Sequence, residues 1–387
     1  PVYLGLLHTE EPYDMSNVEK KGEIPAPTRP TYRFLNVAYP CMNEKQLAIG
    51  ETTTTGKREL RRPDGLFMIE ELERVALERC STAREAIALI GSLAEEYGYL
   101  DEGECLTIAD KKEVWHFEIY GNGTLPVDPK AKKSRKAPVD KPGAMWVAQR
   151  IPDDHVGVSA NIPRISTLNL KDKDNYMASE NVFEVAKKLG FWDGKEPFKF
   201  WKAYGNKKAF SVREFFILDQ LAPSLKLDYE AEEIPFSVKP EKQVDVTDVM
   251  ALLRQTYEGT KWDVTKNLKV TVKERGSEKV DTIISPKANP WMRPDEIKML
   301  KGIKDDAVTQ VRNIAVPQCA YSTVIQLRSW LPDAVGGVVW FSLDNPGQSP
   351  RVPVFCGVKD FPALFDICGN HRYRDDAALW HYREANK

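Results

Sequence analysis

The sequence contains no uninterrupted apolar run of the roughly 18 residues that a membrane-spanning helix requires. Its opening residues, PVYLGLLHTE, show neither the basic leader nor the apolar core of a secretory signal. Formal net charge is only −2, so no field of one sign favours nucleic acid or anionic membrane. We therefore expect neither partner. Homo-oligomerisation and the compartment, cytoplasmic or periplasmic/secreted, stay open.

Metal-binding patterns are also absent. The six cysteines form no CxxC pair, and the five histidines form no HExxH motif. We therefore expect no metal site, and we expect the cysteines to be free, mostly buried thiols.

What the sequence does contain is the composition of a globular protein, with 42% apolar and 29% charged residues. A chain of 387 residues buries a large core, as one large domain or two ordinary ones. Nine Trp, 14 Tyr and 15 Phe indicate a rigid, aromatic-rich interior or a lined pocket.

The first half of the chain alternates strand and helix signals. Strands are predicted over 32–38 and 46–53, joined by a turn at Asn43–Lys45. Helices follow over 67–79 and from Thr82, where Glu85 completes a capping box and Gly98 marks the end. Strands return at 105–109, 114–120, 144–150 and 156–161, and a basic, Pro/Gly-rich loop covers 121–143. In the strand 114–120, Trp115, Phe117 and Ile119 alternate with His116, Glu118 and Tyr120, which predicts a sheet with two unlike faces.

The second half carries weaker signals. Helices are predicted over 180–189, 212–221 and 246–257, and strands over 268–273, 281–285, 312–318, 337–343 and 352–356. This order predicts an α+β fold. It suits two sheets packed face to face with helices outside, and equally a generic α+β protein.

The segment MNEKQLAIGETT, residues 42–53, resembles a signature of cysteine N-terminal-nucleophile (Ntn) hydrolases of the PepD dipeptidase type. More distantly, it resembles choloylglycine hydrolases and penicillin V acylases. Gln46 stands where glycine is usual. Collinear matches extend over nearly the whole chain: TAREA (82–86), IAD (108–110), WVAQRIPDD (146–154), SANIPRI (159–165), YEGT (257–260) with Asp263 and Thr265, and WFS (340–342).

The resemblance implies a four-layer αββα Ntn sandwich, with additional helices, formed as a single domain by residues 1–387. It also implies hydrolysis of short peptides, chiefly dipeptides, by an N-terminal cysteine through a thioester, with no cofactor. Nothing here matches the Gly-rich segment that follows the family's nucleophilic cysteine. We therefore expect that cysteine and the first strand or strands to lie upstream of Pro1, and the C-terminus at Lys387 to be trimmed. The chain alone is then expected to be inactive.

Oxyanion donors are predicted from the same resemblance. Asn161 ends a predicted strand, donates without titrating, and matches the oxyanion asparagine of choloylglycine hydrolases in an N-x-P setting. The alternative is a strand-end asparagine in a turn before Pro163. Thr53 aligns with a second oxyanion position that is asparagine in the bile-salt branch, so its N–H or hydroxyl is the donor expected. A run of four threonines is otherwise ordinary β-propensity.

Charged candidates complete the predicted site. Arg164 and Arg213 are candidate partners of the nucleophile or of a substrate carboxylate, because a guanidinium binds carboxylate bidentately. Glu51 is the candidate partner of a dipeptide's α-ammonium. For all three the alternative is an ordinary exposed side chain. Cys41 is not favoured as an internal nucleophile, because no histidine stands near it in sequence.

Two rival functions remain. One is an acylase of the bile-salt or penicillin V type, which shares the same machinery. The other is a non-catalytic binding or structural homologue.

Overall fold

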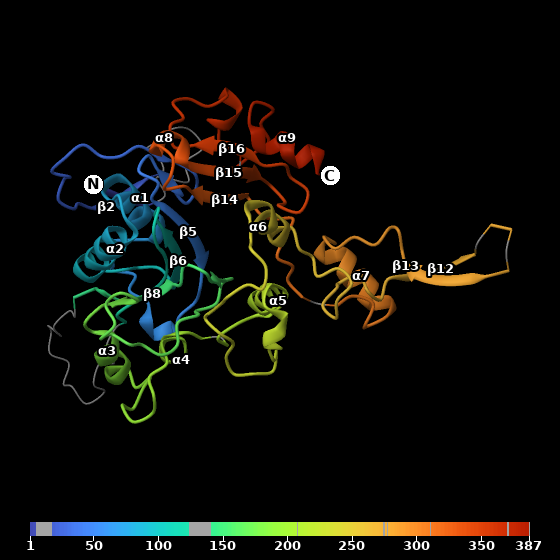
Figure 1. Ribbon diagram of the computed structural model, residues 1–387, viewed down its shortest axis with the longest axis horizontal. Helices are drawn as coiled ribbons and strands as arrows, with labels where there is room; N and C mark the ends of the chain where they lie inside the picture. The colour runs from blue at the N-terminus through green and yellow to red at the C-terminus, as the bar shows by residue number, and fades with distance from the viewer. Residues whose placement is uncertain are drawn as a thin grey trace. The chain divides into compact units, whose positions relative to one another are not determined.

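The computed structural model describes residues 1–4, 18–123, 141–206, 208–273, 275–276, 278–309, 311–369 and 371–386 (Figure 1). The chain divides into two compact units. One comprises Pro1–Gln243, Ile325–Val339 and Pro353–His371, and the other Val244–Val324, Trp340–Val352 and Arg372–Lys387. The single Ntn domain over 1–387 stays a prediction.

The first unit holds most of the regular structure. Its strands are β1 (Val2–Leu4), β2 (Glu19–Gly22), β3 (Phe34–Leu35), β4 (Met42–Asn43), β5 (Ala48–Thr53), β6 (Glu104–Ala109), β7 (Val114–Gly121), β8 (Ala144–Ile151), β9 (Val156–Gly157), β10 (Tyr176–Ala178) and β11 (Ser237–Val238). Its helices are α1 (Ile69–Arg79), α2 (Ala83–Tyr97), α3 (Val182–Lys188), α4 (Phe200–Tyr204), α5 (Val212–Leu221) and α8 (Asp333–Gly336).

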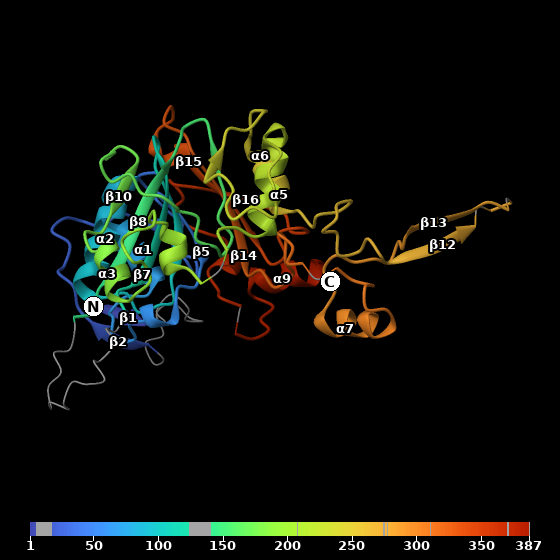
Figure 2. The ribbon, with the colours of Figure 1, turned by 90° about the horizontal axis from the view of Figure 1, so that it is seen from below.

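The remaining elements include a hairpin of β12 (Lys269–Lys273) and β13 (Val280–Ile284), seen as a two-stranded ribbon in Figure 2. The helices here are α6 (Val246–Leu253), α7 (Pro294–Ile303) and α9 (Ala378–Ala385). A three-stranded sheet has the order β14–β15–β16, formed by Tyr321–Leu327, Gly337–Leu343 and Val352–Phe355.

The central feature of the first unit is a seven-stranded sheet of order β10–β8–β7–β6–β5–β4–β3, in which every neighbouring pair is antiparallel. The alternation predicted for β7 is confirmed. Trp115, Phe117 and Ile119 join the core beneath α1 and α2, whereas Tyr120 joins a separate cluster on the opposite face. Two unlike faces follow directly from the period of two along a strand.

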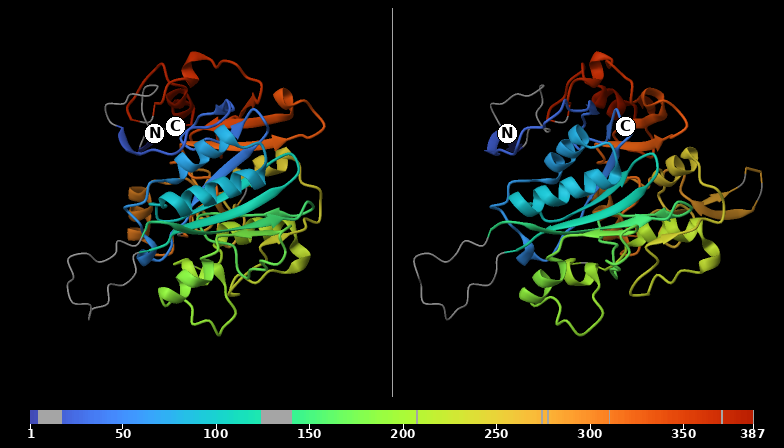
Figure 3. Two further views of the ribbon diagram at one scale, coloured as in Figure 1. Left: turned by 90° about the vertical axis from the view of Figure 1, so that its left-hand side faces the viewer. Right: turned by 60° about the vertical axis from the view of Figure 1, so that its left-hand side comes forward.

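Helices α1 and α2 cover one face of this sheet, and α3 lies across the other (Figure 3). The predicted capping box of Thr82 and Glu85 is present, and α2 ends at Gly98, whose φ of 86° suits glycine. Close packing holds α2 on β8, because a Cβ added at Gly91 would lie 2.3 Å from the Trp146 ring.

The opposite face is packed with aromatic rings, as the composition predicted. Tyr120 of β7 lies against Phe200 and Tyr204 of α4, with ring centroids 5.9 and 6.2 Å away. This cluster ties the segment before α5 to the sheet and so fixes the backbone from which the site described below is built.

Several predicted elements differ from those observed. Residues 312–318 form bends and a turn, not a strand. The strand predicted over 156–161 ends at Gly157, because its partner β11 pairs with only Val156 and Gly157. Asn161 itself takes the left-handed conformation. Of the predicted loop 121–143, residues 124–140 lie outside the described residues.

The α+β prediction is confirmed as a mixed fold of helices and antiparallel sheets. Among the described residues, no helix combines the length and the apolar character needed to cross a membrane.

Candidate functional site

Most of the predicted site residues lie together at the end of β5. Thr53 is the last residue of that strand, and its hydroxyl donates to Glu51 Oε1 at 2.8 Å. Asn161 lies in the loop after β9, and its Nδ2 donates to the Thr53 carbonyl at 2.6 Å. Arg213, in the first turn of α5, donates from Nη1 to Asn161 Oδ1 at 2.9 Å. Hydrogen bonds thus connect Glu51, Thr53, Asn161 and Arg213.

The amide of Asn161 has a defined orientation. A guanidinium offers only donors, so the amide atom that faces Arg213 is the oxygen, and Nδ2 faces the Thr53 carbonyl. One Nδ2 hydrogen is used there, which leaves the second for another acceptor. Asn161 has φ of 60°, a conformation that asparagine tolerates better than most residues. The arrangement presents a neutral, oriented donor.

The main-chain N–H of Thr53 adds a second donor on the same side. Thr54 N bonds to Gly103 O, so Thr53 and Glu104 form the non-hydrogen-bonded kind of pair between β5 and β6. In such a pair, the N–H and the carbonyl of each residue point away from the partner strand. The Thr53 N–H therefore points to the edge of β5 where Asn161 binds the Thr53 carbonyl.

Two buried carboxylates hold the loop that carries Asn161. Glu214 Oε1 accepts from Ala160 N at 2.8 Å, and its other oxygen accepts from Ser211 N at 2.8 Å, closing the capping box of α5. Glu118 Oε1 accepts from Ile165 N at 2.9 Å and also from Arg164 N. Both side chains are 0% exposed. The loop is therefore fixed at both ends from beneath.

Arg164 is placed differently from the other candidates. Its guanidinium is 3% exposed and donates to the carbonyls of Ala209 and Pro235 at 2.5 and 2.6 Å. Burial lowers the pKa of this group, and the carboxylates of Glu214 and Glu118 oppose that effect. Since its donors face the main chain, Arg164 here positions the loop. Its role as a substrate ligand stays a prediction without support from these contacts.

A cluster of carboxyl groups adjoins Glu51 on the helix-covered side of the sheet, and sequence analysis did not identify it. Glu104 of β6 hydrogen-bonds to Glu51, and burial together with the Glu51 charge raises the pKa of Glu104 to about 11. Burial raises the pKa of Glu73 in α1 well above its usual range, and the nearby Glu51 and Glu70 add to this effect. Within the described residues, both Glu73 oxygens lack a hydrogen-bond partner. The sequence did offer one indication of this cluster. Glu104 alternates with Leu106 and Ile108 along β6, and both of these side chains face the core.

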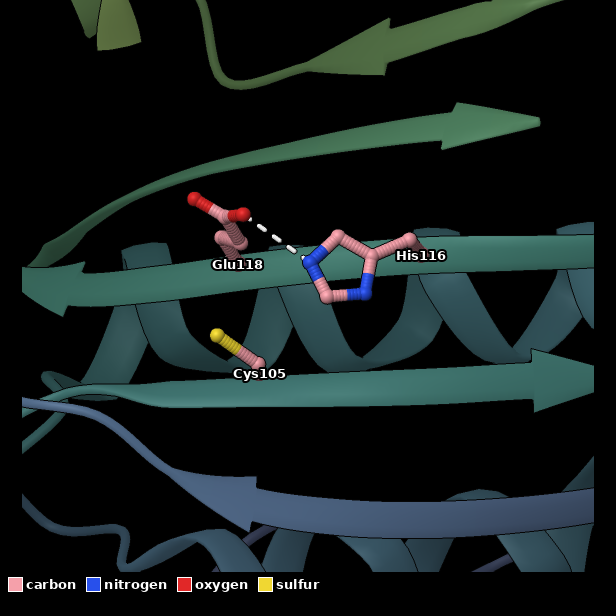
Figure 4. Close-up of side chains that lie close together, drawn as sticks. All are labelled: Cys105, His116 and Glu118. Carbon is pink, nitrogen blue, oxygen red and sulfur yellow. Dashed lines mark hydrogen bonds and ion pairs between the residues drawn. The ribbon is translucent and has the colours of Figure 1, made fainter. Parts of the chain in front are cut away.

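The opposite face of the same strands carries Cys105, His116 and Glu118 (Figure 4). Their ligand-type atoms all lie within 4.8 Å of one another, and His116 Nε2 lies 2.9 Å from Glu118 Oε1. Cys105 Sγ donates to the Ile162 carbonyl at 3.7 Å. Burial raises the pKa of the Cys105 thiol well above its usual range, so the trio does not present a ready nucleophile.

All six cysteines lie in the described part of the chain, and each is a free thiol. Cys41 is 3% exposed, and burial raises the pKa of its thiol to about 12, with a contribution from Glu73. A thiol in that state is a poor nucleophile at neutral pH. The surroundings of Cys41 therefore lend no support to an internal nucleophile at this position.

Comparison with known proteins places these features in a family. The model of peptidase family C69 matches residues 15–386. A probable dipeptidase of Latilactobacillus sakei is 26% identical over 291 residues, covering 74% of this chain and 50% of that protein. Probable dipeptidase B of Streptococcus pyogenes serotype M1 is 28% identical over 284 residues, covering 72% of this chain and 47% of that protein. A probable dipeptidase of Salmonella dublin is 26% identical over 299 residues, covering 76% of this chain and 55% of that protein.

The chain thus spans about half the length of the curated relatives it matches. The resemblance to PepD-type dipeptidases seen in the motifs is confirmed, and the match over 15–386 extends through both compact units. The chain belongs to peptidase family C69.

Proposed function

We propose that the protein hydrolyses dipeptides by means of an N-terminal cysteine and a thioester intermediate. The observation that carries the proposal is the oriented amide of Asn161, held by Arg213 and by the Thr53 carbonyl. Family membership and the dipeptidase names of the relatives support the substrate class. We assign the nucleophile to an N-terminal cysteine other than these six, because burial raises the pKa of the Cys41 and Cys105 thiols.

In the proposed reaction the thiolate attacks the peptide carbonyl, and the α-amine of the same cysteine takes the thiol proton. An α-amine has a pKa near 8 and so suits this role at neutral pH. The C–S bond forms, the C–N bond breaks, and the proton passes to the leaving amine. Water then cleaves the thioester, releasing the carboxylate and restoring the thiol.

The tetrahedral intermediate carries an oxyanion, and we assign its donors to Asn161 and Thr53. The second Nδ2 hydrogen of Asn161 and the main-chain N–H of Thr53 lie on the same edge of β5. The Thr53 hydroxyl already donates a hydrogen bond to Glu51. Neutral donors fixed before the reaction stabilise the developing charge without reorganisation. Arg213 acts here through Asn161, whose amide it orients.

The carboxyl groups beside Thr53 favour a dipeptidase over an acylase. Glu51 is partly exposed and accepts a hydrogen bond from the Thr53 hydroxyl, so it lies next to the proposed oxyanion site. A free α-ammonium is the group that a carboxylate there binds, whereas an acyl substrate needs apolar surroundings. We assign Glu51 to the substrate's α-ammonium.

We also propose that the seven-stranded sheet, with α1 and α2 outside it, forms half of a four-layer αββα sandwich in a single Ntn domain. Two features support this: an outer helix pair, and a sheet whose opposite face is also buried and carries an aromatic cluster.

The test compares the complete gene product with residues 1–387 on a dipeptide panel, with and without iodoacetamide. Thiol-sensitive release of free amino acids by the complete product alone is the expected result. N-acetylated dipeptides should be poor substrates, because they lack the ammonium that Glu51 binds. Asn161→Ala should lose activity, whereas Asn289→Ala, at an exposed position in the other unit, should not.

Other outcomes separate the rivals. Preference for N-acylated substrates would replace the dipeptidase with an acylase of related mechanism. Failure of the correctly processed product on both substrate classes would contradict enzymatic function and favour a binding or structural protein. Activity of residues 1–387 alone would contradict the assignment of the nucleophile.

A further inference from the structure

The register of β6 and β7 brings three ligand-type side chains onto one face. Cys105 is paired directly with Glu118, and His116 precedes Glu118 by two residues. Residues two apart on a strand share a face, so His116 and Glu118 project to the same side. Figure 4 shows all three side chains on the side of the strands turned away from the helices.

This cluster is deeply buried and incompletely bonded. Cys105, His116 and Glu118 are 1%, 4% and 0% exposed. Glu118 Oε1 accepts from main-chain N–H groups, but Oε2 has no hydrogen-bond partner among the described residues. A buried carboxylate oxygen without a partner costs free energy, and such an atom requires an explanation.

We propose that Cys105, His116 and Glu118 form a zinc-binding site. A thiolate, an imidazole nitrogen and a carboxylate oxygen are the donors that Zn²⁺ takes in proteins. Thiolate and imidazole together disfavour Ca²⁺ and Mg²⁺, which select oxygen ligands. One neutral and two anionic ligands also balance the charge of a divalent ion in the core. The ligand atoms lie within 4.8 Å of one another, so small side-chain rotations bring them to a common centre.

A cavity of about 390 Å³ adjoins the proposed site at His116. His116 lines it together with Thr107, Ser159 and Phe236. Three protein ligands leave one tetrahedral position, and a water molecule from the cavity is the expected fourth ligand.

The ion has a structural role in this proposal. Glu118 binds it through Oε2 and keeps Oε1 for Ile165 N, so the anchor of the Asn161 loop is preserved. On binding the metal, Cys105 loses its thiol proton and with it the hydrogen bond to the Ile162 carbonyl. The proposal does not depend on the dipeptidase assignment, since it concerns the core beneath the loop.

The test is titration of the tag-free, metal-stripped protein with Zn²⁺ and with Co²⁺. We expect one Zn²⁺ per chain, a higher unfolding temperature, and a thiolate-to-cobalt charge-transfer band. Cys105→Ser and His116→Gln should each weaken binding by roughly 100-fold or more, since loss of an outer-shell partner alone costs 10- to 100-fold. Cys80→Ser, at another buried free thiol, and His155→Gln, at another residue that lines the cavity, should bind as the parent does.

Circular dichroism checks that each variant is folded. If Cys105→Ser does not fold, the charge-transfer band of the parent and its loss in His116→Gln decide the question. Absence of the band, or unchanged binding in either folded ligand variant, would mean an adventitious ion only and would overturn the proposal.

Discussion

Replacing Glu104 with glutamine should stabilise the protein at neutral pH. Glu104 is 1% exposed, hydrogen-bonds to Glu51, and has a pKa of about 11, against 4.5 for an ordinary glutamate. It is therefore protonated in the folded protein at pH 7, whereas the unfolded chain ionises it. A glutamine side chain is uncharged in both states and still donates a hydrogen bond to Glu51.

The magnitude follows from the difference in proton binding. The folded-state pKa is raised, so the stability contributed by this carboxyl is fully present below pH 4.5 and is lost as the pH rises toward about 11. Each pH unit in that window removes about 1.4 kcal/mol. Between pH 4.5 and 7 the loss is roughly 3 kcal/mol, which Glu104→Gln should recover at pH 7.

The assay is urea unfolding of the parent and of Glu104→Gln at several values between pH 5 and pH 8. The variant's advantage in free energy of unfolding should be small at pH 5 and grow with pH. Glu196→Gln, at an exposed position, provides the matched control and should show no such trend. An advantage that does not change with pH, or a variant less stable than the parent at pH 7, would refute the assignment of a protonated Glu104.

Three further predictions concern separate parts of the molecule. In the complete enzyme, Asn161→Ala should lower kcat by about 100- to 1,000-fold with little change in KM, measured by steady-state kinetics. Gln46→Ala should cost roughly 1 to 3 kcal/mol of unfolding free energy, because the buried amide accepts from Arg328 N. Gln46→Gly should cost less, since φ is 62° there. Gly91→Ala should lower the free energy of unfolding by about 1 to 3 kcal/mol, because the added Cβ would overlap the Trp146 ring.

The elements that sequence predicted best are those with local determinants. The α2 helix begins and ends where Thr82, Glu85 and Gly98 indicated, because caps act within one turn. The α5 helix over 212–221 matches the prediction residue for residue. Gln46 also illustrates the point: a position where glycine is usual proves to be left-handed.

Features that depend on pairing between distant segments were not predictable. Residues 312–318 carry a strand-like pattern but have no strand partner, and Pro317 removes a donor. The proximity of Glu104 to Glu51 follows from the register of β5 against β6, which a single sequence does not encode locally. For the site, the resemblance selected Thr53 and Asn161, and the chemistry of the guanidinium selected Arg213. Only the structure showed that they share hydrogen bonds and that Arg164 is turned away.

The anchoring of the Asn161 loop separates two tasks that an enzyme engineer must treat differently. Glu118 and Glu214 hold the loop from the protein interior, through main-chain N–H groups of Ala160 and Ile165. Recognition is proposed to lie at Glu51, on a different strand. A substitution at Glu51 is therefore expected to change substrate preference while the side-chain amide of Asn161 keeps its position. Substitutions of Glu118 or Glu214, by contrast, are expected to lower the proposed activity on every substrate to a similar extent.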